Sequence, residues 1–297
     1  MHICVCICTY KRPELLKGLL DALSTQHTNN RFTYSIVIAD NDKSETGRPV
    51  ANEYAANPKV CVKYCVEPRQ NIALARNKAV ANSIGQFVAF IDDDELPNQD
   101  WLLTLFTTCE QFEADGVLGP VKRRFDERPP KWLLKSHLYE RPVCPTGSVV
   151  AWHEARTGNV LLRKHIFEGG EAPFRPEFRA GEDQDFFRRM IDRGYVFIWS
   201  ADGAVYELVP RARWKRRYML KKALLRGATA RLQPSCGPLS IAKSALAVPA
   251  YGTLLPFALL LGQHKFVTLM VKICDHLGKI LAVLGINPIQ QEYVLDE

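Results

Sequence analysis

A run of five apolar residues that ends in four acids constrains this chain more than any other feature. FVAFI occupies residues 87–91, and DDDE follows at 92–95. A continuous apolar run of this kind indicates a strand buried on both faces of a sheet, whereas four adjacent carboxylates repel one another. A fold tolerates such a cluster where a cation neutralises it or where water screens it. The sequence therefore predicts either a cation site or a solvated polar turn after residue 91.

Strand and helix patterns alternate through the first 95 residues. Apolar strands are predicted at 2–9, 34–40, 60–66 and 86–92, and helices at 13–24 and 71–83. Asn71 can cap the second helix, and Gly85 follows its end. This alternation predicts a parallel sheet wrapped by helices, whose ligands bind at the carboxyl ends of the strands. Four polar residues fall at these ends: Thr9, Asp40, Glu67 and Asp92.

The middle of the chain is less regular. We expect helices at 98–112 and 182–194, and strands at 116–121, 157–163 and 195–202. Several prolines, Pro142 among them, fall within 122–150 and predict a loop or lid. Because loops shape pockets, we expect 122–150 and 164–180 to select the substrate.

Composition places the chain among ordinary globular proteins. Of its 297 residues, 47% are hydrophobic and 24% are charged, which excludes a disordered chain. The nine cysteines include no zinc-spaced CxxC pair, so we expect reduced thiols. The apolar residues 1–8 lead into a polar segment without a cleavage site, and we expect the catalytic part to stay in the cytoplasm.

Residues 211–297 differ in kind from the rest. The segment 211–231 holds nine Lys and Arg and no acid, which accounts for the net charge of +7, and 245–262 carries no charge. A spanning helix needs about 20 apolar residues. Because Pro249, Gly252 and Pro256 interrupt this segment, we expect helices that lie in the membrane interface or re-enter it. A soluble helical subdomain is the alternative, and nucleic-acid binding fits the apolar tail less well.

The carboxylates at 92–95 suit a hard divalent cation. Mg²⁺ and Mn²⁺ take oxygen ligands and usually bind through one or two carboxylates plus substrate phosphates. If the chain stays extended beyond the strand, Asp92 and Asp94 point the same way and can address one nucleotide diphosphate, whereas Asp93 points away. The pattern of a calcium-binding EF-hand is absent.

A second acidic cluster begins the helix predicted at 182–194. Its spacing from the apolar positions places Asp183 on the inward face and Glu182 at the edge of that face. Asp185 precedes two arginines, and we expect it to form an exposed ion pair. An inward carboxylate at a helix start either caps the helix or acts as a base in a cleft, and spacing leaves both readings open.

Several motifs in order carry a resemblance to a known family. They are CICTYKRPELL, IVIADND, NIALARNKAVANSIGQFVAFIDDDELP, TGNVLLR and GEDQDFFRR. Together they resemble the family 2 glycosyltransferases over about residues 2–210, and within that family the succinoglycan-type β-glucosyltransferases of bacterial exopolysaccharide synthesis. The resemblance implies a GT-A fold, an α/β domain with a mixed, mainly parallel sheet, over 1–210. It leaves 211–297 as a membrane-association segment.

The same resemblance assigns roles by position. Nucleotide-sugar contacts are implied for Thr9, Tyr10, Arg12, Asp40, Arg76, Asn77, Asp92, Asp93, Gly158 and Asn159. Asp94 matches the acid that binds Mg²⁺ or Mn²⁺, and Asp183 matches the catalytic base, with Glu182 beside it. Many relatives carry a metal-binding His after the last core strand, where this chain has Tyr206 and Glu207. Either Glu207 replaces that His, or the metal keeps only Asp94, phosphates and water.

The implied activity is an inverting transfer of a hexose from a nucleotide-diphosphate sugar, such as a UDP-sugar, to a hydroxyl of a lipid-linked glycan at the cytoplasmic face of the inner membrane. A nucleotidyltransferase would show a glycine-rich first loop, which TYKRPE lacks, and no GxGxxG of a dehydrogenase follows the first strand. The non-enzyme alternative is a membrane-bound sugar-nucleotide binder with a decayed site. The carboxylates of the motifs, Asp40, Asp92, Asp94 and Asp183, argue against it.

Overall fold

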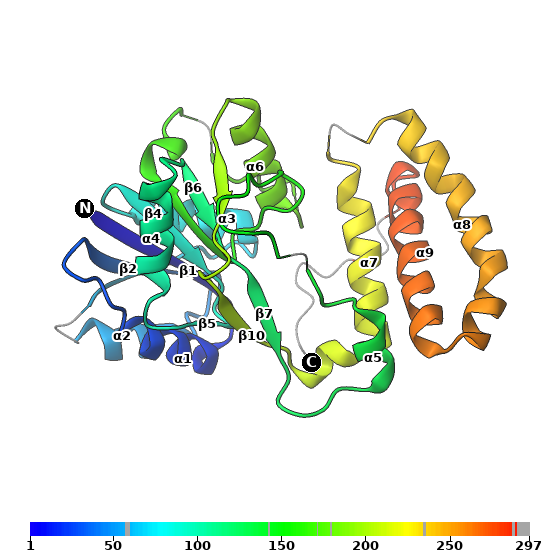
Figure 1. Cartoon of the computed structure of the whole chain (residues 1–297), viewed down its shortest axis with the longest axis horizontal. Helices are drawn as coiled ribbons and strands as arrows, with labels where there is room; N and C mark the ends of the chain where they lie inside the picture. Colours follow the sequence, from blue (N-terminus) through cyan, green and yellow to red (C-terminus); the bar gives the residue numbers. More distant parts are fainter. Residues whose placement is uncertain are drawn as a thin grey trace. The chain divides into compact units, whose positions relative to one another are not determined.

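The computed structural model describes residues 1–56, 60–141, 143–170, 172–178, 180–233, 236–286 and 289. The chain forms two compact units (Figure 1). The first comprises Met1–Arg123, Pro142–Glu177 and Glu182–Glu207, and the second comprises Arg124–Arg141, Phe178–Gly181 and Leu208–Glu297. Pro142, one of the prolines of the predicted lid, lies outside the described residues.

A seven-stranded sheet forms the centre of the first unit. Its order is β3 (Cys61–Val66), β2 (Thr33–Asp40), β1 (His2–Thr9), β4 (Phe87–Ile91), β8 (Asn159–Arg163), β6 (Gly116–Leu118) and β9 (Phe197–Trp199). The first four strands are mutually parallel, with Thr9 beside Asp40 in the register. β8 runs antiparallel to both β4 and β6. The sheet is therefore mixed and mainly parallel, as predicted.

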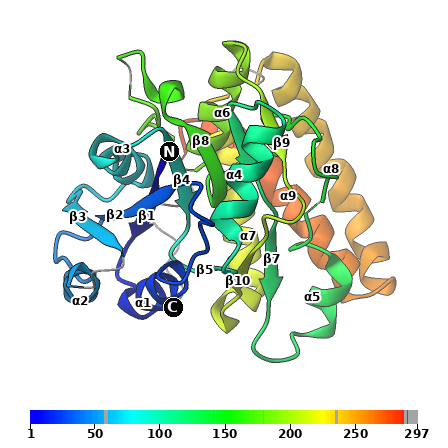
Figure 2. The ribbon, with the colours of Figure 1, turned by 60° about the vertical axis from the view of Figure 1, so that its left-hand side comes forward.

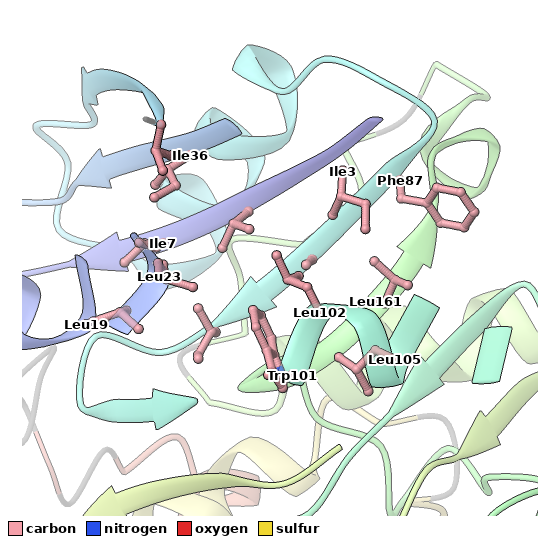
Figure 3. Packing of buried hydrophobic residues seen from close by; sticks show 14 of the residues in the cluster. Ile3, Ile7, Leu19, Leu23, Ile36, Phe87, Trp101, Leu102, Leu105 and Leu161 are labelled. Atoms are coloured by element: carbon pink, nitrogen blue, oxygen red, sulfur yellow. The ribbon is translucent and has the colours of Figure 1, made fainter. Parts of the chain in front are cut away.

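Helices cover both faces of this sheet, because every central strand is apolar on both sides. On one face lie α1 (Pro13–Leu23), α2 (Arg48–Ala55) and α4 (Trp101–Gln111). On the other lie α3 (Ile72–Asn82) and α6 (Glu182–Asp192). Figure 2 shows α3 and the pair α1 and α2 on opposite sides of β1 to β3. In Figure 3 the buried Leu102 and Leu105 of α4 lie beside Leu161 of the sheet.

The connecting regions contain elements that the sequence patterns missed. The strand expected at 116–121 ends at Leu118, and a separate β7 (Val121–Arg124) pairs in a small sheet of order β5 (Glu95–Pro97), β10 (Val205–Leu208) and β7. The predicted lid at 122–150 contains the short helix α5 (Lys131–Ser136), and η1 (Lys164–Phe167) follows β8. The helix α2 was not predicted, because its eight residues begin with Arg-Pro and have only two buried side chains.

The second unit is helical. It contains η2 (Arg211–Trp214), α7 (Arg216–Ala230), α8 (Pro238–Leu260) and α9 (Gln263–Val283). α9 contacts both α7 and α8 (Figure 1). The expectation that prolines break the apolar segment is wrong: Pro249 and Pro256 lie inside one continuous helix. Among the described residues, α8 alone is long and apolar enough to cross a membrane.

Candidate active site

The acidic cluster forms a tight turn at the carboxyl end of β4. The Glu95 amide donates to the Asp92 carbonyl over 3.1 Å, and the Asp92 amide donates to Glu95 Oε2 over 3.2 Å. The extended chain on which the predicted directions of Asp92, Asp93 and Asp94 depended is therefore not present. A turn does not alternate its side chains as a strand does, so the neighbours Asp93 and Asp94 can share one partner.

That partner is Arg12, from the loop after β1. Arg12 Nη1 lies 3.2 Å from Asp93 Oδ1 and 3.4 Å from Asp94 Oδ2. Thr9 Oγ1 donates to Asp93 Oδ2 over 2.8 Å. Asp93 is buried, and this burial raises its pKa to about 7 although Arg12 opposes the shift. The prediction that Asp93 points away from the cluster is therefore wrong. Its side chain instead connects the carboxyl ends of β1 and β4.

Glu95 is a site residue that the sequence motifs did not indicate. Its side chain is buried, and burial raises its pKa well above the ordinary value, with Asp92 and Asp94 adding to the shift. Gly158 is a glycine because a Cβ there would lie 2.7 Å from Glu95 Oε1 and 3.0 Å from Asp92 Oδ2. Glu95 also stands opposite Glu207 in the β5–β10 register. Its position as the fourth acid after a buried strand was the available signal.

Arg76 on α3 joins the two acidic clusters. Its Nη1 donates to Glu182 Oε1, and its Nη2 lies 3.6 Å from Asp92 Oδ1. Burial lowers the pKa of Arg76, but Glu182, Asp92 and Asp183 together raise it above the ordinary value. Burial also raises the pKa of Glu182 to about 7, against the influence of Arg76. The guanidinium thus stays charged between carboxylates from β4 and α6.

The first turn of α6 differs in part from the prediction. Glu182 is the more deeply buried acid. The Asp183 side chain is 14% exposed to solvent, and its Oδ2 lies 4.0 Å from Arg156 Nε. Asp183 Oδ1 accepts a hydrogen bond from the adjacent Gln184 amide over 2.8 Å. The carboxylate predicted to act as the base is therefore reachable from solvent and adjoins the Arg76–Glu182 pair.

Asp185 does not form the exposed ion pair that was expected. It is fully buried, and its oxygens accept hydrogen bonds from Arg188 over 3.2 Å and Arg189 over 2.9 Å. Arg175 lies 3.8 Å away. The expectation failed because helical spacing identifies the partners of Asp185 but not the segment around Arg175 that packs over it.

The side chains of three other residues that were predicted to contact the nucleotide sugar form hydrogen bonds within the protein. Asp40 is fully buried and accepts from the Asp42 and Gly47 amides, each over 2.9 Å, and from Tyr64 Oη over 2.7 Å. It thereby positions the loop after β2. Its predicted contact with the base or ribose stays a prediction.

Asn77 and Asn159 also hold neighbouring backbone. Asn77 donates to the Phe174 carbonyl over 2.7 Å and accepts from the Phe174 amide over 2.9 Å. Asn159 accepts from Trp101 Nε1 over 2.8 Å and donates to the Gly203 carbonyl over 2.7 Å. The structure thus assigns both side chains to positioning, and their predicted contacts with the nucleotide sugar stay predictions. Tyr10, half-buried beside Thr9 at the end of β1, remains a predicted contact as well.

The carboxylates of the site suit a divalent cation that is also bound by the phosphates of the substrate. Within the part of the chain that the structure describes, no three His, Cys, Asp or Glu side chains gather closely enough to hold a metal by themselves. Glu207 is buried and accepts from Arg123 Nε over 3.1 Å. Mg²⁺ usually binds through one or two carboxylates plus substrate phosphates. Asp94, alone or with Glu207, therefore fits such a shared site.

Sequence comparison relates this chain to known glycosyltransferases. Residues 4–177 match the family model described as glycosyl transferase family 2. The chain is 32% identical over 234 residues to the succinoglycan biosynthesis protein ExoM of Rhizobium meliloti, which covers 77% of this chain and 74% of that protein. It is 24% identical to the glycosyltransferase AglE of Haloferax volcanii, over 67% of this chain and 64% of that one.

Solved structures show the same fold at low sequence identity. The mannosyltransferase PcManGT of Pyrobaculum calidifontis, in complex with GDP-Man and Mn²⁺, aligns with a TM-score of 0.64 and 18% identity over 94% of this chain and 86% of that one. S. aureus TarS 1–349 in complex with UDP aligns with a TM-score of 0.54 and 16% identity, over 96% and 92%. The fold is GT-A. With its family match and the relative at 32% identity, this chain belongs to glycosyl transferase family 2.

Proposed function

We propose that this glycosyltransferase moves a hexose from a nucleotide-diphosphate sugar, a UDP-sugar in our assignment, to a hydroxyl of a lipid-linked glycan, with inversion at the anomeric carbon. The observation that carries the proposal is the position of Arg76, which joins Asp92 at the end of β4 to Glu182 beside Asp183. Donor-binding and base-bearing carboxylates thus adjoin at the sheet edge where such folds bind ligands.

The chemistry follows from that placement. Asp183 accepts the proton of the acceptor hydroxyl as its oxygen bonds to the anomeric carbon. The bond from that carbon to the diphosphate oxygen breaks on the opposite face, and the nucleoside diphosphate leaves with the electron pair. One such displacement converts an α-linked donor into a β-linked product. Asp92 orients the ribose.

A divalent cation would be held by Asp94, with Glu207 as a second candidate ligand. When bound, it would offset the charge that develops on the leaving diphosphate. The relatives support this use of a cation, since the PcManGT complex contains Mn²⁺ with GDP-Man. Thr9, Tyr10 and Arg12 lie at the same sheet edge, where they can contact the nucleotide.

We assign the catalytic domain to 1–210 and membrane association to 211–297, and we propose that transfer takes place at the cytoplasmic face of the inner membrane. The support is the apolar α8 and the similarity to a succinoglycan biosynthesis protein. That similarity also supports a role in exopolysaccharide synthesis. Family membership disfavours the nucleotidyltransferase alternative.

A donor screen tests the proposal without knowledge of the acceptor. Purified protein is incubated with UDP- and GDP-sugars and Mn²⁺ or Mg²⁺, and release of nucleoside diphosphate is followed. We expect slow hydrolysis of one UDP-hexose that stops on addition of EDTA. Release of nucleoside diphosphate from GDP-sugars alone would overturn the assignment of uracil as the nucleobase of the donor. Binding of a nucleotide sugar in calorimetry without release of nucleoside diphosphate from any donor would support the alternative of an inactive sugar-nucleotide-binding subunit.

A further inference from the structure

The outward face of α8 is exposed, and it is apolar except at Lys243, which shares this face with Leu239 and Leu246. The helix carries one charged residue, Lys243. Large side chains that remain mostly in solvent occur in every part of it and in the turn that follows: Leu239 (80%), Leu246 (73%), Leu254, Phe257, Leu259, Leu260 (85%) and Leu261. Soluble monomers rarely expose a continuous apolar strip of this kind, so a partner surface is indicated.

The inward face of α8 is polar where it meets α9. Lys279 Nζ donates to Ser240 Oγ over 3.0 Å, and His276 Nδ1 lies 3.0 Å from Ser244 Oγ. Tyr251 packs against the His276 ring. These contacts fix which side of α8 faces α9, and they leave the leucine-rich side outward.

The second unit is also strongly basic. Between residues 208 and 286 there are thirteen Lys and Arg, and Asp275 is the sole acid. Arg226 forms a two-pronged ion pair with that acid. Nine of these cations lie within 211–231, and α7 packs on α9 rather than on α8. The two helices beside the apolar strip carry Lys243, Lys265, Lys272 and Lys279 and the single acid Asp275. A lipid surface with anionic headgroups complements this pair of helices, because the lipid chains take the leucines and the headgroups take the lysines.

The polar residues of α9 decide how α8 can meet a bilayer. If α8 crossed the membrane with its contacts intact, α9 would carry Lys272, Asp275, His276 and Lys279 into the hydrocarbon. Each Lys or Asp at the bilayer centre costs on the order of a hundredfold in partitioning. A helix lying in the interface avoids this cost, because long cationic side chains can reach the headgroups.

We propose that α8 is a monotopic anchor: it lies along the surface of an anionic bilayer, with its leucine-rich face among the acyl chains and with α9 above it. This narrows the localisation proposed above. It does not depend on the transfer chemistry, because binding to vesicles requires neither donor nor acceptor.

Vesicle sedimentation of the full-length protein tests the surface. We expect binding to phosphatidylcholine vesicles that contain phosphatidylglycerol, and much weaker binding to pure phosphatidylcholine or at high salt. Leu246→Gln and Leu254→Gln should each weaken binding about tenfold, since each removes one inserted leucine. Ile84→Gln is the matched control, because Ile84 is a 60% exposed apolar residue of the first unit. Equal binding by all four proteins would overturn the proposal, and so would variants that change only the oligomeric state.

A protease site tests the orientation. A TEV cleavage sequence is inserted between Gly262 and Gln263, at the turn between α8 and α9, and the protein is bound to sealed vesicles. Circular dichroism confirms that the helices persist. A monotopic α8 leaves this turn outside, so external protease should cut it as fast as in the vesicle-free protein. Protection that disappears on detergent addition would show that α8 crosses the bilayer and would overturn the proposal.

Discussion

Arg76 on α3 donates a hydrogen bond to Glu182 on α6, although 106 positions separate the two residues in the sequence. Both side chains are buried. Removing one partner of a buried pair leaves an uncompensated charge and costs about 3–5 kcal/mol, whereas removing both costs less. We expect Arg76→Met to lower the free energy of unfolding by roughly 3 kcal/mol at alkaline pH. Adding Glu182→Gln should restore part of that loss in urea denaturation, and strictly additive effects would show that the pair is not coupled.

Asp185 provides a contrast between buried and exposed ion pairs on one helix. Asp185 and Asp192 both bond Arg188, but the Asp185 side chain is 1% exposed and that of Asp192 is 63% exposed. Asp185→Asn should cost about 3 kcal/mol of stability, and the matched control Asp192→Asn should cost less than about 0.5 kcal/mol. Thermal melting compares the two variants. Similar melting temperatures would mean that burial does not distinguish the pairs.

The raised pKa of Glu182 predicts how stability depends on pH. Burial lifts this pKa from 4.5 to about 7 in the folded protein. The group therefore holds its proton more tightly when folded, so its contribution is present below the unfolded pKa and is lost as pH rises through the folded one. Relative to wild type, Glu182→Gln should gain stability as pH rises from 4.5 to about 7. A constant difference across the range would contradict the assignment.

Apart from α2, the strands and helices of the first 91 residues were predictable because local signals agree there. Apolar runs marked β1, β2, β3 and β4, and the Asn71 side chain caps α3 as its sequence suggested, accepting from the Ala73 and Leu74 amides. The three short strands of the small sheet were not predictable. β5 spans only three residues and pairs with β10 more than a hundred positions away, so no local periodicity marks it.

The candidate site was predictable at the level of residue types but not of partners. The motifs singled out Asp93 and Arg12, yet their contact depends on a turn after β4 that strand periodicity does not predict. Asp185 and Glu95 were misjudged or missed for the same reason, since their burial results from segments distant in sequence. Tertiary packing, which spacing does not report, decides whether a carboxylate is a surface charge or part of a site.

The turn after β4 separates a metal ligand from a structural acid. Asp94→Ala should abolish the Mn²⁺ dependence of UDP binding in titration calorimetry, because the cation loses its proposed anchor. Asp93→Asn should retain that dependence, since the amide keeps an acceptor for Thr9 or Arg12 and Asp93 lacks a proposed role at the metal. An equal loss of Mn²⁺ dependence in both variants would contradict the assignment of Asp94, rather than Asp93, as the metal ligand.

Arg12 should compete with the cation at this site. Its guanidinium lies 3.4 Å from Asp94 Oδ2, so a divalent ion must displace it or share the carboxylate. Arg12→Gln should therefore tighten binding of Mn²⁺ in the absence of nucleotide, by roughly threefold to tenfold, as followed by the electron paramagnetic resonance of free Mn²⁺. Lys11→Gln, which removes a neighbouring charge without contact to Asp94 in the structure, is the control. Weaker Mn²⁺ binding in Arg12→Gln would contradict the competition.

The assignment of Asp183 as the general base is tested most directly by turnover at unchanged affinity. Asp183→Asn preserves the size of the side chain, and its amide oxygen can still accept the hydrogen bond from the Gln184 amide. It cannot take the proton of the acceptor hydroxyl. A general base contributes about 10²–10⁴ to the rate. We predict normal melting, an unchanged dissociation constant for UDP with Mn²⁺, and release of nucleoside diphosphate at least about a hundredfold slower. Wild-type turnover, or a loss that tracks a lower melting temperature, would show that Asp183 caps α6 and that the base lies elsewhere.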